Sequence, residues 1–436
     1  MEFVTDNQTQ KELELQGRYN RKSILSLFNK TKTIGGSRVL DDIFNQPLND
    51  AKQINTRKEI ISFYGQLNIH LPFDEDEFEK VENYLADSVA NTKLASGINL
   101  WWTKYKSKLL LNDDYDDLRE GVETTVEVFF RLKKLMTQLQ TKSSGSLVEK
   151  KVIEFNSLLN QNYLDLDNWN NLRKPYRFSE VKKIDFLLRG QLKKVFRKLL
   201  DLIYEMDVYL AVAKVAVENN FVYAHAIDKE KKIIDIKGVY HPKLKNAVGN
   251  DVRIDSEQNV LFLTGANMAG KTTLMKSVST ALYLAHLGFP VAAKEMTFSV
   301  HDGLFTSINL PDNITQGYSH FYAEVLRVKK VATEIASGKQ LIIIFDELFK
   351  GTNVKDAYDA TVSLVDAFSN HKGSFVISTH LIEAGKALKT NNKLLFKKQP
   401  SFMEGGMPSY TYQLEDGLSD DRHGMFILRN EGILGI

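Results

Sequence analysis

Two patterns of hydrophobic positions divide the chain near residue 230. Before that point, apolar residues recur at three- and four-residue steps over long segments, a spacing that places them on one face of a helix. Residues 181–219 therefore predict one long helix or two in series, and residues 115–140 predict another. Between them, Lys142-Ser-Ser-Gly-Ser146 is a helix-breaking cluster. We expect the first 230 residues to form an all-α domain in which two long helices pack as antiparallel levers.

After residue 230, short apolar runs alternate with helical patterns. The predicted strand–helix pairs are 260–264 with 271–287, 341–345 with 356–369, and 375–378 with 381–388. This alternation is typical of a mostly parallel sheet covered by helices. Further β structure is expected near 232–262 and 395–428. The sequence thus predicts an α+β protein of two domains, an all-α domain over 1–230 and an α/β domain over 231–436.

Composition changes this picture little. The 436 residues carry a net charge of +2, and residues 1–230 contain 34 basic and 34 acidic residues, so the total charge does not point to nucleic acid. The absence of cysteine excludes disulfides, thiolate metal sites and cysteine nucleophiles. The N-terminus lacks the pattern of a secretory signal, and no apolar stretch has the length of a membrane span. A cytoplasmic protein without membrane contact is expected.

A glycine-containing loop separates the first predicted strand of the α/β domain from its helix. Gly265-Ala-Asn-Met-Ala-Gly-Lys-Thr272 has the spacing of a phosphate-binding (P-loop) motif, in the strand–loop–helix context that the motif needs. Glycines let the backbone N–H groups turn toward phosphates, and the helix start adds its positive dipole end. The predicted ATP-binding residues are Gly265, Ala266, Asn267, Met268, Ala269, Gly270, Lys271, Thr272 and Thr273. A chance match is the alternative, and the flanking strand and helix argue against it.

The motif assigns roles to two of these side chains. Lys271 would reach the β- and γ-phosphates during catalysis, and Thr272 would bind Mg²⁺. Asp346 and Glu347 follow the most apolar strand, at the carboxyl end where open α/β sheets bind ligands. Asp346 would hold Mg²⁺, and Glu347 would polarise the attacking water as general base. The alternative for this acidic pair is a solvated turn at the end of a strand.

One histidine completes the set of catalytic candidates. His380 follows the third predicted strand, so that strand would bring it to the same edge of the sheet. From there it could contact the γ-phosphate or the attacking water. A lone histidine is more often structural, and spacing alone does not decide between these roles.

The four segments around these residues resemble the MutS family of DNA mismatch-repair ATPases. Thr264-Gly-Ala-Asn-Met-Ala-Gly-Lys-Thr272 is similar to the family's TGPNMGGKS/T loop, in which Asn-Met is the most diagnostic part. Asp346-Glu-Leu-Phe-Lys-Gly-Thr-Asn353 is similar to DEIGRGTS, and Ser378-Thr-His380 to ATH. Gly317-Tyr-Ser-His-Phe-Tyr-Ala-Glu324 is similar to the GxSTFxxE signature, with His320 in place of Thr.

The similarity extends beyond these segments, in the family's order, so that it covers nearly the whole chain. The matching segments are 6–15, Thr31-Lys-Thr-Ile-Gly-Gly-Ser-Arg-Val-Leu40 with Gln46-Pro-Leu48 and Ile54-Asn-Thr-Arg57, 204–211 at the end of the levers, and His241-Pro242. The resemblance implies an ABC-like ATPase that works as a dimer. The segment Gly317–Ser319 would then complete the partner's nucleotide site in trans, with Ser319 as the contact residue.

Departures from the family pattern carry expectations of their own. The core-domain pattern begins at residue 6, so the mismatch-reading and connector domains are expected to be missing. Residues 142–183 are few for the family's DNA clamp, and the chain ends at Ile436 without room for a C-terminal helix-turn-helix element. Ala247 stands where the family has an aromatic side chain that stacks on adenine, which implies looser base selectivity.

A basic segment at the expected lever tip is the candidate DNA contact. Between Arg173 and Lys183, five basic residues alternate with aromatic ones: Arg173, Lys174, Tyr176, Arg177, Phe178, Lys182 and Lys183. Such a patch could bind phosphates and stack on bases. It could equally be a solvated turn with an aromatic side chain beneath it. The tryptophans at 101, 102 and 169 favour a core or interface role over base stacking.

Three functions remain open at this point. The first is a MutS-type ATPase that clamps DNA of altered structure without probing mispairs, as a homodimer through its ATPase domain. The second is an ATP-driven dimerising switch that acts on a protein partner. The third is a degenerate nucleotide-binding scaffold, against which intact Lys271, Thr272, Asp346, Glu347 and His380 argue.

Overall fold

The chain forms two compact units, each discontinuous in sequence. The computed structural model describes residues 2–17, 23–67, 69–86, 100–105, 114–161, 163–266, 268–308, 320–404 and 407–419. The first unit comprises Met1–Phe28, Ile43–Lys58 and Val215–Ile436, and the second comprises Asn29–Asp42 and Glu59–Lys214. Helices and sheets are both present, which confirms the mixed class. The chain changes from helices to strands at β1 (Val222–Tyr223), while the predicted domain division at residue 230 remains a prediction.

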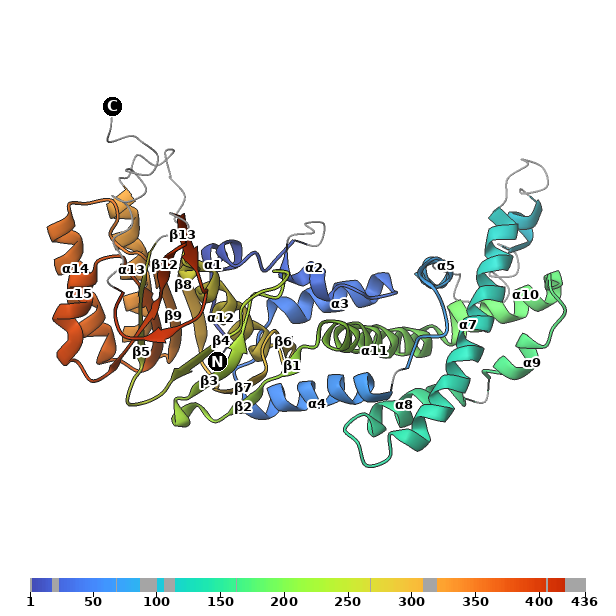
Figure 1. Ribbon diagram of the computed structural model, residues 1–436. Helices are drawn as coiled ribbons and strands as arrows, with labels where there is room; N and C mark the ends of the chain where they lie inside the picture. Colours follow the sequence, from blue (N-terminus) through green and yellow to red (C-terminus); the bar gives the residue numbers. More distant parts are fainter. Residues whose placement is uncertain are drawn as a thin grey trace. The chain divides into compact units, whose positions relative to one another are not determined.

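The second unit is helical over its described residues. It contains α5 (Glu75–Ala86), α7 (Asp114–Lys142), α8 (Glu149–Leu159), α9 (Leu166–Asn170), α10 (Phe178–Asp185), the π-helix η1 (Phe186–Gln191), and parts of α3 (Ile34–Asn45), α4 (Ala51–Leu67) and α11 (Lys193–Asn219). The helix predicted over 115–140 is α7, and the pattern over 181–219 is carried by α10, η1 and α11 in series (Figure 1). None of the helices in the described ranges is long and apolar enough to cross a membrane.

A buried carboxylate holds the start of α3 within the second unit. Asp207 accepts hydrogen bonds from the backbone N–H groups of Lys32 and Thr33, both at 2.9 Å, and from the Thr33 hydroxyl at 2.8 Å. Burial raises the pKa of Asp207 to about 6, although these hydrogen bonds oppose the rise. A Cβ atom on Gly35 would lie 2.2 Å from the ring of Tyr204. Gly35 of the Thr31–Leu40 segment is therefore required by close packing.

A six-stranded sheet forms the centre of the first unit. Its order is β14–β11–β5–β10–β9–β8, with β14 antiparallel to its neighbour and the other strands parallel. The strands are β5 (Val260–Gly265), β8 (Gly303–Ser307), β9 (Leu341–Asp346), β10 (Gly373–Ser378), β11 (Leu394–Gln399) and β14 (Glu415–Asp416). The three predicted strands are β5, β9 and β10. Their carboxyl ends meet, because Ser378 of β10 is paired with both Leu263 and Asp346.

Helices cover this sheet. They are α12 (Lys271–His286), α13 (His320–Ala336), α14 (Val354–Ser369) and α15 (Ile382–Ala387), with the short η4 (Leu388–Thr390). Alternate strand residues such as Phe262, Ile343 and Phe375 are buried in one apolar cluster with Val331 of α13 and Val365 of α14. Figure 1 shows α13, α14 and α15 gathered on one side of the strands. Because β5, β9 and β10 are buried almost throughout, their sequences read as continuous apolar runs.

Smaller sheets complete the first unit. Strands β2 (His225–Ile227), β7 (Glu295–Ser299), β3 (Ile234–Val239) and β4 (Asn250–Ile254) form one sheet in that order; β1 pairs with β6 (Pro290–Val291), β12 (Ser401–Glu404) pairs with β13 (Met407–Tyr410), and η2 (Lys229–Lys231) precedes β3. Strands β3 and β4 confirm the additional β structure expected near 232–262, and β11 to β14 confirm it for the described part of 395–428, of which residues 405–406 and 420–428 lie outside the described residues.

The N-terminal residues belong to the first unit rather than to the helices that follow them. Val4 pairs with Gly303 of the outer strand β8, and α1 (Asn7–Glu12) packs against β8, with α2 (Ile24–Phe28) after it. The side chain of Arg327 in α13 contacts Asp6 and donates from Nε to the carbonyl oxygen of Thr306 at 3.0 Å. The outer edge of the sheet is thus covered by the first segment of the chain.

Candidate functional site

Two glycines shape the loop between β5 and α12. Gly265 has φ 148° and Gly270 has φ 103°, a region that favours glycine. A Cβ atom on Gly265 would lie 2.7 Å from the carbonyl oxygen of Gln399 in β11, and one on Gly270 would lie 3.0 Å from Cδ1 of Tyr412. Gly270 also precedes the first residue of α12. The glycines of the motif are therefore required both for backbone conformation and for space.

Lys271 begins α12 and points back into the loop. Its Nζ atom donates to the carbonyl oxygens of Gly265 at 2.7 Å and Ala266 at 3.0 Å, and lies 3.6 Å from Oε1 of Glu347. The side chain is 4% exposed. Burial lowers the pKa of Lys271, and the nearby Glu347 carboxylate partly counteracts this effect. A buried cation thus lies at the positive end of a helix, where an anion would be bound.

Asp346 lies at the end of β9 and joins the neighbouring elements. Its Oδ2 atom accepts a hydrogen bond from the hydroxyl of Thr272 in α12 at 2.5 Å, and its Oδ1 atom accepts one from the hydroxyl of Ser378 in β10. The carboxylate and the Thr272 hydroxyl are hard oxygen donors, the ligands that Mg²⁺ prefers. These residues fit a magnesium ion that takes its other ligands from water and phosphate. No cluster of three or more acidic or histidine ligands exists among the described residues.

Glu347 lies between two ammonium groups. Its Oε2 atom is 2.6 Å from Nζ of Lys350, and its backbone N–H donates to the carbonyl oxygen of Ser378 at 3.0 Å. Burial by itself would raise the pKa of Glu347, but the hydrogen bond and charge of Lys350, with the charge of Lys271, lower it below its usual value. The carboxylate is therefore ionised at neutral pH, as a general base must be.

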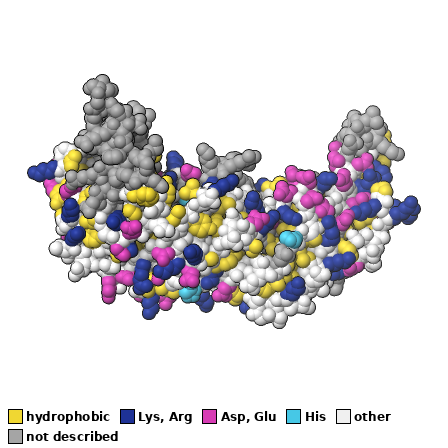
Figure 2. Space-filling view, in the orientation of Figure 1, with side chains coloured by type: hydrophobic (Ala, Val, Ile, Leu, Met, Phe, Trp, Pro, Cys, Tyr) yellow, Lys and Arg dark blue, Asp and Glu magenta, His cyan; other side chains and the backbone are white. Residues whose placement is uncertain are grey.

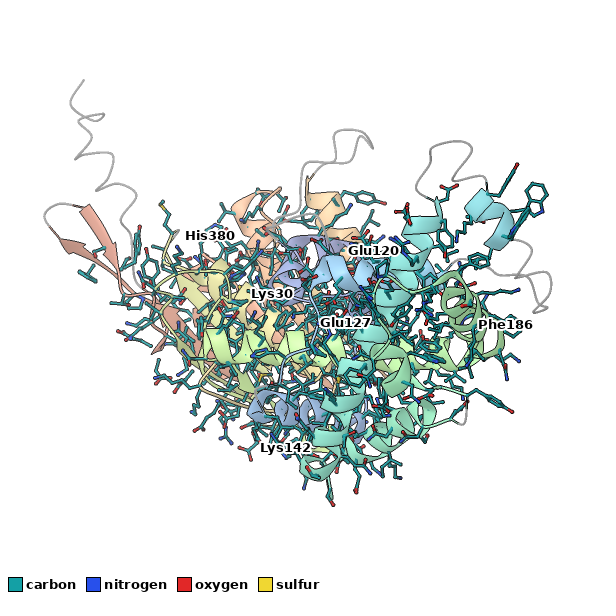
Figure 3. All side chains as sticks on the ribbon, turned by 90° about the vertical axis from the view of Figure 1, so that its right-hand side faces the viewer. Lys30, Glu120, Glu127, Lys142, Phe186 and His380 are labelled. Carbon is teal, nitrogen blue, oxygen red and sulfur yellow. The ribbon has the colours of Figure 1, made fainter. Side chains whose placement is uncertain are left out.

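His380 is placed beside this carboxylate. Its Nδ1 atom lies 3.9 Å from Oε2 of Glu347, and its side chain is 56% exposed (Figure 3). The structure thus brings the predicted residues Lys271, Thr272, Asp346, Glu347 and His380 together at one edge of the sheet. Sequence reasoning assigned no role to Lys350 or Ser378, although both lie in the quoted segments.

A cavity of about 360 Å³ opens beside the loop. Predicted loop residues line it together with chain segments that the motif does not contain: Val239, His241, Leu244, Lys245, Asn246, Ala247, Val248, Asn250, Ala266, Met268, Gly270, Lys271, Thr272, Thr273, Leu274, Ser277, Glu347, Gln399 and Tyr412. Met268 is 83% exposed at φ 70°, and Ala269 is buried. Asn267 lies outside the described residues. The volume is in the range of sites for small organic ligands.

Tyr412 is the aromatic side chain that sequence reasoning missed. Its carbonyl oxygen accepts a hydrogen bond from Nδ2 of Asn250 at 2.9 Å, and Oδ1 of Asn250 accepts one from the backbone N–H of Leu414 at 2.7 Å. Asn250 of β4 thereby fixes the 412–414 segment at the cavity wall, where Ala247 also lies. No local pattern marks Tyr412, because it reaches the cavity from a segment far along the chain.

The comparisons with known proteins fit this geometry. A family model described as MutS domain III matches residues 8–226, and one described as MutS domain V matches residues 261–433. The chain belongs to the MutS family. The family resemblance inferred from the motifs is thus confirmed, and the second match includes the loop, both carboxylates and His380.

Relatives with similar sequences include bacterial proteins named DNA mismatch repair protein MutS. The chain is 24% identical over 441 residues to that of Fusobacterium nucleatum, covering 96% of this chain and 48% of the relative. It is 24% identical over 450 residues to that of Streptococcus agalactiae, covering 96% and 50%. A match of 27% identity over 256 residues to that of Geobacillus thermodenitrificans covers 56% and 28%. The chain spans about half the length of the relatives that it matches most fully.

In the region matched by MutS domain III, only some side chains of the predicted lever-tip patch are positioned to contact DNA. Arg173, Arg177, Lys182 and Lys183 are exposed. Lys174 is paired with Glu127 of α7 at 2.5 Å. Tyr176 is 3% exposed, and its hydroxyl donates to the carbonyl oxygen of Trp169 at 2.7 Å, so it lies beneath the turn rather than presenting a stacking face.

Acidic residues of α7 accompany these basic ones. Glu120 pairs with Lys80 at 2.5 Å, and the backbone N–H of Tyr176 donates to Glu123 at 2.7 Å. Figure 3 labels Glu120 and Glu127 on this helix, and Figure 2 shows acidic side chains mixed with basic ones over the helices of this unit. On the face drawn there, the described residues of the MutS domain III region present no continuous basic surface.

The tryptophans of the MutS domain III region divide into two kinds. Trp169 is 5% exposed, which agrees with the core alternative of its predicted core or interface role. Trp101 and Trp102 are 52% and 50% exposed, which excludes the core alternative for them, and their interface role stays a prediction. The ring of Trp101 stacks on that of Tyr105 at 5.4 Å, and Nζ of the intervening Lys104 lies 4.7 Å from the ring of Phe178. An aromatic group is therefore presented to solvent at this place.

Proposed function

We propose that this MutS-family chain is a Mg²⁺-dependent ATPase. The observation that carries the proposal is the convergence of Lys271, Thr272, Asp346 and Glu347 where β5, β10 and β9 end side by side. A buried ammonium group, two hard oxygen donors and an ionised carboxylate are the parts that phosphoryl transfer to water requires. Their adjacency makes one site out of segments distant in the sequence.

Each side chain would act at a stated atom. The Lys271 ammonium would exchange the carbonyl oxygens of Gly265 and Ala266 for the β- and γ-phosphate oxygens. Thr272 and Asp346 would hold Mg²⁺, which neutralises charge on the phosphates when bound. The Glu347 carboxylate would accept a proton from the attacking water, with His380 orienting that water or the γ-phosphate from the exposed side.

The cavity beside the loop supports an adenine site. Ala247 offers no ring, but Tyr412 lies on the same cavity wall and could stack on a purine. Its position is fixed by Asn250 through two hydrogen bonds on either side of Gln413. Base selectivity would then depend on a tyrosine supplied from beyond β13, rather than being lost with Ala247.

The test of the ATPase proposal is the turnover of the wild-type chain and of Glu347→Gln. Phosphate release should depend on Mg²⁺, and the variant should bind ATP with affinity similar to that of the wild type. Its turnover should fall by at least about 100-fold, because the amide cannot accept the proton of water. A wild-type protein without turnover, or a variant that hydrolyses ATP at the wild-type rate, would exclude the proposal.

We also propose a homodimer formed through the ATPase region, in which Ser319 contacts the nucleotide of the partner copy. Both Gly317 and Ser319 lie outside the described residues, so support comes from the family membership. ATP contacts across such an interface favour the closed state because ADP lacks the γ-phosphate. Sedimentation of Glu347→Gln with ATP or ADP tests this: association with ATP alone is expected, and a monomer in both would exclude it.

DNA is the partner we propose first, bound through the exposed lever-tip residues Arg173, Arg177, Lys182 and Lys183. The relatives are named for DNA mismatch repair, which supports a role on DNA. We keep the predicted cytoplasmic location, since a chain without cysteine suits a reducing compartment. Binding that weakens with added salt and differs between ATP and ADP is expected. Absence of binding at low salt to duplex, branched and single-stranded DNA would exclude DNA as the partner.

A protein partner is the second candidate, and one observation favours it. Near the lever tip, Lys174 is already paired with an acidic residue of α7, whereas Trp101, Trp102 and Tyr105 are exposed. Exposed tryptophan and tyrosine side chains are enriched at protein interfaces. Under this alternative the ATPase rate is unchanged by any DNA, and substitution of Trp101 by alanine leaves DNA binding unaltered.

A further inference from the structure

The loop after β9 has two residues in an unusual backbone conformation. Glu347 has φ 48° and Phe349 has φ 66°, both in the left-handed region. For a bulky residue such as phenylalanine this conformation is an outlier that costs free energy. In the DEIGRGTS segment that 346–353 resembles, the position of Phe349 holds glycine, which adopts this conformation without strain. This chain therefore combines a backbone conformation that favours glycine with a bulky side chain that opposes it.

The phenylalanine ring is held by packing. Phe349 is 5% exposed and belongs to the apolar cluster that contains Val331 of α13 and Ala357 of α14. Its ring centre lies 5.9 Å from that of Phe321, the second residue of α13, with the planes at 55°. Burial of a large ring supplies the free energy that offsets an unfavourable backbone conformation. The contact also ties the loop to the first turn of α13.

The same loop carries the carboxylate of the proposed general base. Its first residue is fixed by the hydrogen bond from the Glu347 N–H to the Ser378 carbonyl oxygen, 3.0 Å long. Its far side is fixed by the Phe349 ring, and Lys350 then reaches back to Oε2 of Glu347 at 2.6 Å. If residue 349 lost its ring, the loop would keep the first attachment and lose the second. The Glu347 side chain would then sample a wider range of positions.

We propose that Phe349 is a positioning residue that sets the Glu347 carboxylate through its ring contact with Phe321. The inference rests on the proposed ATPase function. Because α13 directly follows the 317–319 segment in sequence, the contact also makes the position of Glu347 depend on the position of that helix. The aromatic pair thereby couples the loop to α13.

The experiment compares turnover and nucleotide affinity in Phe349→Gly, Phe349→Leu, Phe349→Tyr and Phe321→Leu. We expect Phe349→Gly to lower kcat by about tenfold or more, since small misplacement of a catalytic group has large kinetic effects. The Kd for ATP, measured separately, should change by no more than about twofold, because Lys271 and Thr272 are untouched. Phe349→Tyr keeps the ring and should retain kcat. The Phe349→Leu and Phe321→Leu variants keep most of the apolar volume but remove the aromatic contact. They test the proposal if Phe349→Gly does not fold.

A matched control separates positioning from loss of core packing. Phe368 lies in the same apolar cluster, 4% exposed, and its ring contacts Phe345 and Phe375 rather than the loop. Phe368→Leu should lower the thermal midpoint about as much as Phe349→Leu, yet leave kcat within about twofold of the wild type. The double variant Phe349→Leu/Phe321→Leu should be no slower than the slower single variant, because both remove one contact.

The outcomes distinguish this inference from the proposed function. If the wild type does not hydrolyse ATP, or if Glu347→Gln hydrolyses it equally fast, the ATPase proposal itself fails. If that turnover exists but Phe349→Gly and Phe349→Leu keep the wild-type kcat, only the positioning role is overturned. Equal loss of kcat in Phe368→Leu, or effects of Phe349 and Phe321 that multiply in the double variant, would also overturn it.

Discussion

Lys271 in the first unit and Arg189 in the second are both buried cations, but they are held in different ways. Arg189 contacts its neighbour Asp185 at 2.6 Å, and Asp185 also accepts a hydrogen bond from Tyr84 at 2.8 Å. Lys271 instead donates to two loop carbonyl oxygens, while its closest carboxylate, on Glu347, lies 3.6 Å away. The charge of Arg189 is neutralised within the fold, whereas the charge of Lys271 lies where an anion would be bound.

Two carboxylates, the buried Asp207 and the half-buried Asp346, show the same contrast. Asp207 accepts hydrogen bonds from backbone amides and a hydroxyl that belong to the fold of the second unit. Asp346 accepts from the hydroxyls of Thr272 and Ser378, groups that can rotate toward another partner. Burial alone therefore does not mark a functional site. The partners of Lys271 and Asp346 are carbonyl and hydroxyl groups, which are exchanged for ligand contacts at a smaller cost than the buried ion pair of Arg189.

The largest expected effect is a loss of stability when the buried ion pair of Arg189 and Asp185 is broken. Arg189→Met leaves Asp185 as a buried charge without its cation, so we expect a loss of about 3–5 kcal/mol in the free energy of unfolding. ATP turnover per folded molecule should be unchanged. Urea unfolding measures the first quantity, and the double variant Asp185→Leu/Arg189→Met should be less destabilised than the single one. If Arg189→Met were as stable as the wild type, Arg189 would not differ from Lys271 in its contribution to stability.

The matching substitution in the first unit, Lys271→Met, should weaken ATP binding and leave the stability of the fold unreduced. Lys271→Met removes the cation from the proposed phosphate site, so the Kd for ATP should rise by at least about 100-fold, which is about 3 kcal/mol. The free energy of unfolding should hold or rise, because a desolvated charge is replaced by an apolar chain. Adenosine, which lacks phosphates, should bind both proteins equally. If ATP binding were unaffected, Lys271 would have no role in a phosphate site.

The pH dependence of stability tests the second unit separately. The pKa of Asp207 is raised to about 6 in the folded state from 3.8. Its folded form therefore holds a proton more tightly than the unfolded chain does. The stability gained by protonation is fully present below pH 3.8 and is lost as pH rises through about 6. Relative to Asp207→Asn, wild-type stability should decline by up to about 3 kcal/mol between pH 4 and pH 7. A constant difference across that range would contradict the raised pKa.

The smallest expected effects concern the lever tip. Arg173→Ala and Lys182→Ala remove exposed charges, and each should weaken DNA binding by about 1 kcal/mol and reduce the salt slope by about 0.9. Lys174→Ala is the matched control, because Glu127 already compensates its charge at 2.5 Å. It should change affinity less than either. Equal effects of all three substitutions would show that the Lys174 pair opens on DNA.

The sequence predicted which candidate residues would lie together where their arrangement is local. Gly265, Gly270, Lys271 and Thr272 are close in sequence, and a strand, a turn with left-handed glycines and a helix start fix their arrangement. Asp346 and Glu347 were found because a buried parallel strand reads as an apolar run that must end at the ligand-binding edge. The aligned order of motifs then identified the family, which the domain matches confirm.

Other features were beyond sequence reasoning. Tyr412 reaches the cavity only because Asn250 binds the segment that carries it, and no periodic pattern encodes such a contact. Tyr176 alternates with basic residues as a stacking side chain would, yet it is buried under its turn. Trp101 and Trp102 have apolar rings but remain exposed, since exposure depends on which neighbours are available to cover them.

The amino-acid sequence by itself determined the local elements, the phosphate-loop motif and the family, because each follows from backbone preferences and side-chain types within a short segment. The tertiary structure alone decided which distant segments meet: that residues 2–15 join the strands of the first unit, that Tyr412 lines the same cavity as Ala247, and that Phe349 touches Phe321. Contacts of this kind depend on the close packing of complete elements, whose geometry no single segment specifies.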